Sequence, residues 1–260
     1  MRLLRAGRVL LPAAGLALAA CAGQALPPDV RVEGGDPAVN GSFLLPYTNA
    51  WKFTLQRPGA EPVEAGVWTD KMEIVTSGGT PAMKRTQEAR YKRGVRLTFV
   101  NLFDPKTMAS MTFDYTRSDT GETRHLQIRD KTARFRRAPG TGDQPAQDYT
   151  VTLDHRVLDF YDGLYGILLD AFPLKEGYAA TFPAFDTDRA AIDWVKLNVS
   201  GRETVVGPSG QSYQAWVVRV ESSQYASSTW WLTREAPYVL KAVLVTPERE
   251  GGVTITYTMV

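Results

Sequence analysis

Much of this chain alternates between apolar and polar residues, with a period of two. The C-terminus shows the pattern most clearly, because threonines at positions 254, 256 and 258 separate Val253, Ile255, Tyr257 and Met259. The same alternation occupies residues 47–56, 95–103, 111–115, 149–153, 195–199 and 216–220. Successive residues of a β-strand point to opposite faces, so each segment has one face for a core and one for water.

Turn residues separate the alternating segments. Stretches that contain glycine, often with serine or proline, lie at 77–81, 118–121, 207–210 and 250–252. Short strands joined by such turns usually form antiparallel sheets. We therefore predict an all-β fold in which a single strongly curved antiparallel sheet, a half-barrel or β-roll, spans residues 46–260.

One segment departs from the strand pattern. Between residues 156 and 172, apolar residues recur at helical spacing, at Val157, Tyr161, Leu164, Leu168 and Phe172. Asp154 is suited to cap a helix here, and Pro173 to end it. The spacing predicts one helix over 156–172, apolar on most of its surface. Such a helix must be covered, so we expect it to pack on the open side of the curved sheet.

The first twenty residues have the order of a secretory signal peptide. Arginines at positions 2, 5 and 8 precede an apolar run over 9–20, which is too short to span a bilayer. The run ends in Leu18-Ala19-Ala20-Cys21, which resembles the lipobox of bacterial lipoproteins, whose cysteine becomes the lipidated first residue. We predict a signal peptide over 1–20, lipid attachment at Cys21 and a flexible tether over 21–45. The alternative is cleavage near Ala25, which leaves no anchor.

The single cysteine supports lipidation, because an exported protein would otherwise carry an unpaired thiol in an oxidising compartment. Several acyl chains would hold the protein stably on a membrane. Ala22 follows the cysteine where some enterobacterial lipoproteins have aspartate, and this resemblance implies the periplasmic face of the outer membrane. The chain has 30 Lys and Arg against 28 Asp and Glu, and loss of the three leader arginines leaves 27 against 28. A nearly neutral protein does not favour a nucleic-acid partner.

Candidate catalytic and metal-binding residues are few. His125 and His155 are the only histidines, and no G-x-S-x-G segment accompanies them, so we expect both to be partly exposed and without a catalytic role. The aspartates of the predicted helix, at 159, 162 and 170, are the only hard-metal candidates that the spacing suggests. Asp159, Asp162 and Asp170 lack an Asp-x-Asp-x-Asp-Gly loop, so we expect a solvated helix face. We expect no catalytic residue, metal or cofactor.

Two further features allow two interpretations each. A basic stretch, consisting of Arg124, Arg129, Lys131, Arg134, Arg136 and Arg137, suits either a charged edge strand or contact with anionic headgroups or glycans. Trp230 and Trp231 are neighbours, so on a strand they must face opposite sides. One is expected in the interior, either in a filled core or lining a cavity that holds an apolar ligand.

Three hairpin-like segments resemble an exported bacterial family, domain of unknown function 3108. They are the strand and turn over 100–108, the Gly-x-Glu-x-Val hairpin over 201–213, and the Trp-Leu strand, turn and returning strand over 231–241. The resemblance covers about residues 47–260. It implies a curved-sheet fold, similar in outline to lipoprotein carriers of the Gram-negative periplasm.

These observations favour a non-enzymatic envelope lipoprotein that binds an apolar or amphipathic ligand or assists an envelope partner. The alternatives are a structural or assembly lipoprotein with a filled core and, with less support, an envelope hydrolase. A carrier requires an apolar cavity of several hundred cubic ångströms, roughly the range of ligand pockets. The sequence assigns no ligand-binding residues.

Overall fold

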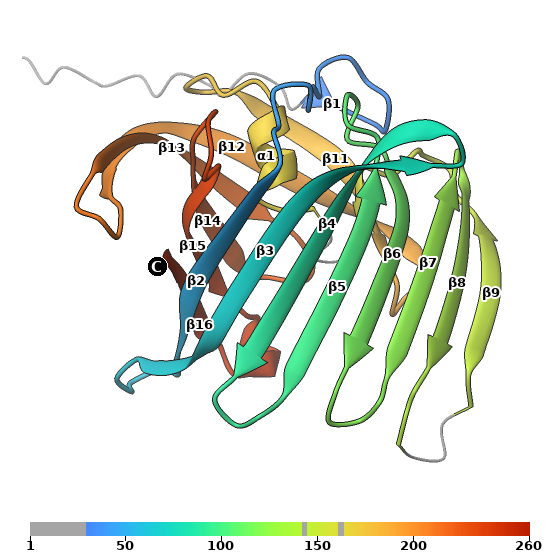
Figure 1. Ribbon diagram of the computed structural model, residues 1–260, viewed down its shortest axis with the longest axis horizontal. Helices are drawn as coiled ribbons and strands as arrows, with labels where there is room; N and C mark the ends of the chain where they lie inside the picture. Colours follow the sequence, from blue (N-terminus) through green and yellow to red (C-terminus); the bar gives the residue numbers. More distant parts are fainter. Residues whose placement is uncertain (1–29, 142–144, 161–163) are drawn as a thin grey trace, which may run out of the picture.

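The computed structural model describes residues 30–141, 145–160 and 164–260, and its strands form one sheet of 16 strands. The order across the sheet is β1-β11-β12-β13-β14-β15-β16-β2-β3-β4-β5-β6-β7-β8-β9, with β10 also beside β11. Most neighbours are antiparallel, and Figure 1 shows the sheet curling strongly around its concave face. The prediction of an all-β fold built on a single curved antiparallel sheet is confirmed.

The elements have the following bounds. The strands are β1 (Val30–Arg31), β2 (Tyr47–Gln56), β3 (Val63–Ser77), β4 (Thr80–Tyr91), β5 (Arg96–Phe103), β6 (Ser110–Arg117), β7 (Thr123–Arg129), β8 (Thr132–Ala138), β9 (Gln147–Thr152), β10 (Asp159–Phe160), β11 (Ala179–Asp186), β12 (Ala191–Val206), β13 (Ser212–Glu221), β14 (Ser227–Leu232), β15 (Val239–Val245) and β16 (Thr254–Met259). The helical elements are α1 (Ile167–Ala171) and the 3-10 turn η1 (Glu248–Glu250).

The alternating sequence positions divide the sheet into an inner and an outer face. In β2, Trp51 and Phe53 are buried while Lys52 between them is exposed. The same alternation buries Ala133 and Phe135 of β8. The inner faces of both halves of the sheet supply the apolar core, since every second residue points to the concave side.

The sheet does not close into a barrel. Strand β11 pairs with β1 and β10 in parallel on its outer edge, and β9 at the opposite end pairs with β8. Side chains connect these two ends: the Tyr149 hydroxyl of β9 donates to the carbonyl oxygen of Thr187 at 2.9 Å. Phe135, Phe160 and Phe185 belong to one buried cluster beside this contact. The two ends of the open sheet are therefore connected by side chains and not by backbone pairing.

The helix predicted over 156–172 is wrong in extent. Helix α1 spans only Ile167–Ala171, and Asp159–Phe160 instead forms β10 beside β11. Gly166, with φ at 76°, precedes α1 in a conformation that glycine adopts more readily than other residues. The described residues from 157 to 172 are buried inside the curved sheet, whatever their local structure. Burial on all sides favours closely spaced apolar residues, and this spacing led to the prediction of a longer helix. Tyr161 and Asp162 lie outside the described residues.

The tether predicted over 21–45 is wrong from Val30 onward. Val32, Val39 and Leu44 are buried in the main core cluster. Backbone bonds fix the segment, since the Val32 nitrogen donates to Thr181 oxygen at 3.0 Å and the Asn40 nitrogen to Ala171 oxygen at 3.0 Å. Glycine, proline and aspartate did indicate irregular backbone, but an irregular segment can still pack. The predicted signal peptide and Cys21 lie outside the described residues.

The N-terminal segment covers one end of the curved sheet (Figure 1). The Gly41 nitrogen donates to the carbonyl of Lys106 in the β5–β6 turn at 2.8 Å, which places the segment at that end of the strands. Within the described ranges, no helix has the length and apolar character needed to cross a bilayer.

Substitution of two neighbouring leucines tests the packing of the N-terminal segment. Leu44 is 3% exposed and Leu45 is 65% exposed. Leu44→Ala should lower the free energy of unfolding by about 2–5 kcal/mol, because it removes buried methyl groups and leaves a cavity. Leu45→Ala should change it by less than about 0.5 kcal/mol. Urea denaturation of both variants measures the difference, and equal effects would contradict the packed arrangement.

Candidate functional site

The concave face of the sheet contains an aromatic cavity of about 190 Å³, here called the inner chamber. Its walls come from both halves of the sheet and from the segment before α1. They consist of Trp51, Trp68, Asp70, Arg85, Gln87, Tyr91, Leu97, Phe99, Tyr165, Tyr225, Trp230, Val239, Ala242, Leu244, Ile255 and Tyr257. Apolar surface predominates in this lining, which therefore suits an apolar group.

A small residue between two large aromatic residues contributes to the space. Ala242 of β15 lies in register between Tyr257 of β16 and Trp230 of β14, so a methyl group separates two large rings. A larger residue at position 242 would extend into the space between these rings.

Aromatic contacts fix the walls of the inner chamber. Trp68 stacks on Phe99, with ring centroids 5.3 Å apart, and meets Tyr257 edge to face at 5.7 Å. Tyr165 stacks on Trp230 at 6.1 Å. Such pairs contribute beyond the area they bury, so the rings form an organised surface.

A buried ion pair between Asp70 and Arg85 lies in the wall of the inner chamber. The side chains are 0% and 5% exposed, and Arg85 Nη2 donates to Asp70 Oδ2 at 2.6 Å. Arg85 Nε lies 2.9 and 3.0 Å from the two carboxylate oxygens, and Nη1 donates to the carbonyl oxygen of Tyr165 at 3.1 Å. The Tyr47 hydroxyl donates to Asp70 Oδ2 at 2.9 Å. The pair thus connects β2, β3 and β4 with the segment before α1.

These contacts determine the charge states of the cluster. Burial lowers the pKa of Arg85, but the charge of Asp70, the hydrogen bond to it and the interactions with Tyr47 and Asp159 together outweigh this effect, so the pKa is raised. Burial, reinforced by the charge of Asp70, raises the pKa of Tyr47 well above its usual value. Arg85 therefore stays charged, and Tyr47 keeps the proton that it donates to Asp70.

Gln87 extends this cluster along the inner face of β4. Its amide is assigned with the oxygen toward Trp68 Nε1 and Arg85 Nη2, 3.3 Å from each, because the opposite orientation would set donors against donors. Gln87 is 5% exposed. Arg85 and Gln87 lie on the same face of β4, since they are two residues apart on the strand.

A larger cavity of about 660 Å³, here called the mouth, adjoins the inner chamber. The two share Leu97 and Phe99 as lining residues, so they lie next to each other. The other residues of the mouth are mostly polar: Phe113, Tyr115, Arg124, Asp186, Thr187, Asp188, Arg189, Ser223, Gln224, Arg249 and Glu250. The β6–β7 turn precedes Arg124, so the mouth lies at the end of the strands opposite the N-terminal segment.

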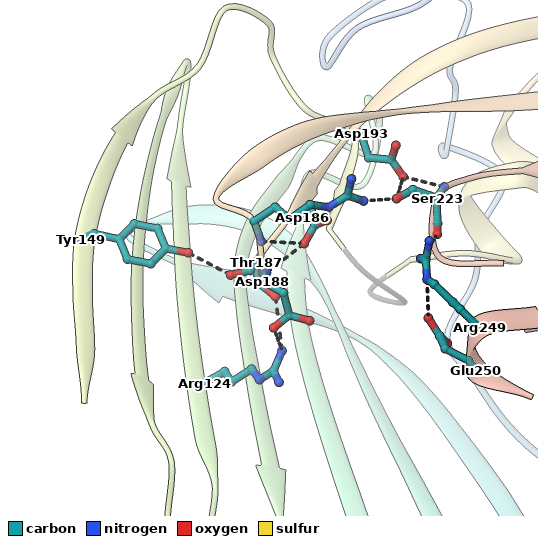
Figure 2. A network of polar contacts seen from close by, with 10 residues as sticks. Arg124, Tyr149, Asp186, Thr187, Asp188, Asp193, Ser223, Arg249 and Glu250 are labelled. Carbon is teal, nitrogen blue, oxygen red and sulfur yellow. Dashed lines mark hydrogen bonds and ion pairs between the residues drawn. The ribbon is translucent and has the colours of Figure 1, made fainter. Parts of the chain in front are cut away.

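Residues 186–190, here called the mouth loop, join β11 to β12 and are held from both sides (Figure 2). On one side, Thr187 accepts the bond from Tyr149, and Asp188 Oδ1 lies 3.2 Å from Arg124 Nη1. Burial and the charges of Asp188 and Asp186 raise the pKa of Tyr149 to about 12, so its hydroxyl keeps the proton that it donates.

On the other side, Arg189 of the mouth loop donates to Ser223 Oγ, and Ser223 Oγ donates to Asp193 Oδ2 at 2.7 Å. Asp186 orders the loop internally, since its Oδ1 accepts the backbone N–H groups of Asp188 and Arg189 at 2.9 and 3.0 Å. The lining of the mouth carries equal numbers of opposite charges, namely Arg124, Arg189 and Arg249 against Asp186, Asp188 and Glu250. It is therefore polar without a large net charge.

The two histidines lie outside both cavities. His125 Nδ1 is 2.7 Å from Asp114 with both side chains about half exposed, and His155 Nδ1 is 2.5 Å from Glu33. Their predicted partial exposure is confirmed. Neither histidine lines the inner chamber or the mouth, so no histidine-based catalytic set forms at the candidate site. In the ranges that the structure describes, no three His, Cys, Asp or Glu side chains are placed to share a metal ion.

The prediction of a solvated face for the aspartates is wrong for Asp159 and Asp170, which are both 0% exposed. Asp159 Oδ1 accepts the N–H groups of Phe160 and Leu164 at 2.8 and 2.9 Å and so orders the chain before α1. Neither carboxyl oxygen of Asp170 has a hydrogen-bond partner among the described residues. Burial raises the pKa of Asp170 to about 8, although the charge of Arg234 opposes the shift.

The basic stretch does not form an edge strand, because β9 covers β8 and both β7 and β8 are internal to the sheet. Arg124 instead belongs to the mouth, and Arg137 Nε lies 2.8 Å from Glu122. Contact of the other basic side chains with headgroups or glycans stays a prediction.

The two adjacent tryptophans face opposite sides, as predicted. Trp230 lines the inner chamber. Trp231 donates to Glu203 at 2.7 Å, and Lys241 lies over its ring at 4.6 Å, on the outer face.

Comparisons with known proteins identify the fold and a family of unknown function. The model of the family described as "Protein of unknown function (DUF3108)" matches residues 49–252. The chain is also similar to a crystal structure from Brucella abortus, a beta-barrel-like protein of domain of unknown function DUF1849. That similarity has a TM-score of 0.52 and 11% sequence identity over 85% of this chain and 97% of the other. The comparison with curated proteins gives no match.

Asp170 makes stability depend on pH. Its pKa is 3.8 in an unfolded chain and about 8 in the folded protein. Between these values only the folded state binds the proton, so the free energy of unfolding falls as pH rises and levels off above pH 8. Asp170→Asn should remove this contribution, making the variant increasingly stable relative to the wild type from pH 4 to 8.

Urea denaturation at several pH values measures the Asp170 effect. Asp148→Asn is the matched control, because Asp148 is exposed and the substitution changes the charge equally. A constant difference between Asp170→Asn and the wild type across this pH range would contradict the assignment.

Proposed function

The chain belongs to the DUF3108 family of unknown function, and we propose that it is a non-catalytic binding protein for an amphipathic ligand. The apolar end of the ligand would enter the inner chamber, and its polar part would remain in the mouth. The observation that carries this proposal is that an aromatic cavity and a polar one lie side by side and share Leu97 and Phe99 as lining residues.

The cavity sizes restrict the ligand. The inner chamber, at about 190 Å³, is smaller than the several hundred cubic ångströms expected for a carrier of long acyl chains. An apolar cavity of roughly 150 Å³ can bind benzene. The inner chamber therefore suits a compact group, such as one substituted ring. The mouth, at about 660 Å³, has room for a larger polar part.

The mouth supplies interactions for that polar part. Asp188 is 60% exposed and Arg249 is 71% exposed at their side chains, so both remain accessible to a ligand. Guanidinium and carboxylate groups form charge-assisted hydrogen bonds with phosphate, carboxylate or ammonium groups. Asp188 belongs to the mouth loop and contacts Arg124, so a ligand there would contact a residue that joins the two halves of the sheet.

We also propose that the protein acts in the cell envelope, anchored through Cys21 at the periplasmic face of the outer membrane. The signal-peptide pattern and the lipobox-like residues 18–21 support this placement. An anchor before Val30 would leave the mouth at the far end of the sheet, accessible to a ligand or an envelope partner.

Native mass spectrometry of the protein without residues 1–21 tests ligand binding. We expect a co-purifying small molecule on the wild type. Ala242→Leu should abolish the bound mass, because the longer side chain occupies the space between Tyr257 and Trp230. Lys241→Leu is the matched control on the outer face of the same strand and should retain it.

Circular dichroism of both variants verifies that they fold. A wild type without any bound mass would contradict the proposal and favour a scaffold that acts through its outer surface. Retention of the bound mass by Ala242→Leu would place the ligand elsewhere.

A further inference from the structure

We propose that the end of the sheet opposite the mouth is a lipid-contacting face, which lies on the membrane surface when the protein is anchored. The contact residues are 37–46 of the N-terminal segment and 74–83 at the tip of the β3–β4 hairpin, here called the uncharged rim. This inference rests on the proposed anchoring at Cys21 and adds the orientation that the protein takes on the bilayer. In that orientation the mouth faces away from the lipid.

The two segments of the uncharged rim meet at the same end of the sheet (Figure 1). Tyr47, directly after the first segment, pairs with Met72, two residues before the second. Beyond Met72, β3 continues in register with β4 as far as the pair of Ser77 and Thr80. The hairpin tip therefore extends past the start of β2, next to the chain that leads into it.

Both segments are free of charged residues. Residues 37–46 and 74–83 contain no Asp, Glu, Lys or Arg, in a chain of which 22% of the residues are charged. Leu45 and Ile74 are nevertheless large apolar residues that are 65% and 61% exposed. Exposed apolar surface of this kind, bordered by polar groups, is typical of a face that contacts a membrane or another protein.

Charged groups of both signs border the uncharged rim. Lys71 Nζ lies 2.7 Å from Glu73 Oε1 just before the second segment. The Arg234 guanidinium lies over the half-buried ring of Phe43, 4.8 Å from its centroid. An arginine above an aromatic ring is suited to the membrane interface, where its stem contacts apolar groups and its charge stays hydrated. Because the bordering charges balance, the contact should depend on apolar surface and not on anionic lipid.

The short connection to the anchor favours a membrane as the occupant of this face. Between Cys21 and Val30 lie residues 22–29, which reach at most about 30 Å at full extension. Val30 pairs with Ala180 at the start of β11, whereas the mouth loop follows the other end of that strand. The anchor therefore joins the domain at the end that carries the uncharged rim. Acyl chains in the bilayer would keep Leu45 and Ile74 close to lipid, and apolar burial there adds to the binding.

Single-cysteine labelling of a tethered protein tests this orientation. The protein begins at residue 22, which keeps every strand, and a preceding hexahistidine tag binds it to vesicles that contain nickel-chelating lipid. Cys21 is the only cysteine of the chain, so this protein has none until Leu45→Cys or Ile74→Cys supplies one. Val63→Cys is the matched control, because Val63 is 65% exposed and lies at the opposite end of β3 from Ile74.

A nitrobenzoxadiazole label on each cysteine reports contact with lipid. On phosphatidylcholine vesicles, the labels at positions 45 and 74 should emit more strongly, and lipid with a nitroxide on its acyl chain should quench them. The label at position 63 should show neither change. Addition of phosphatidylglycerol should have little effect on the quenching.

A second substitution tests whether the apolar side chains make the contact. In the protein labelled at position 45, Ile74→Asp should remove most of the quenching, because it brings a charge into the contact. Val63→Asp is its matched control and should leave the quenching unchanged. Circular dichroism of each variant verifies that it folds.

Three results would overturn the inference while leaving ligand binding and lipid attachment untouched. They are absence of quenching at positions 45 and 74, equal quenching at position 63, and quenching that requires phosphatidylglycerol. Label emission that rises with protein concentration without vesicles would also overturn it, because a second copy of the chain would then occupy the uncharged rim. A full-length chain without acyl mass at Cys21 would overturn the proposed anchoring and this inference together.

Discussion

The buried ion pair of Asp70 and Arg85 is the interaction on which the interior depends. Desolvation makes any such pair expensive, so it persists only when the remaining donors and acceptors are satisfied. Tyr47, Gln87 and the Tyr165 carbonyl meet that requirement from three directions. The same bonds fix the segment before α1 against the sheet. A polar cluster thus sets the shape of an otherwise aromatic chamber.

The open sheet explains where the mouth lies. A closed barrel has no free edge. Here β9 and β11 approach each other without backbone pairing, and side chains pack in the space between them. The mouth loop crosses from one half of the sheet to the other, held by Arg124 on one side and Ser223 on the other. Because these contacts are mostly between charged or polar side chains, salt and ligand would affect them more than they would affect the strand ladders.

The sequence predicted the strands because alternation depends on local geometry alone. It misassigned the segment after 156 because apolar spacing reports burial, and a chain enclosed by a sheet is buried on every side. It missed the packing of Val32, Val39 and Leu44, since those contacts join residues far apart in the chain. Asp70, Arg85 and Gln87 did leave a signal: they are polar residues on the otherwise apolar face of strands. Their pairing across β3 and β4 required the register, which no local pattern supplies.

A double-mutant cycle on the ion pair tests its central role most directly. The free energies of unfolding of the wild type, Asp70→Asn, Arg85→Met and the double variant are measured by urea denaturation at neutral pH. Each single substitution should cost about 3–5 kcal/mol, because it leaves an uncompensated group in the interior. The double variant should cost several kcal/mol less than the sum of the two. Additive costs would show that the two groups do not depend on each other and would contradict this account of the interior.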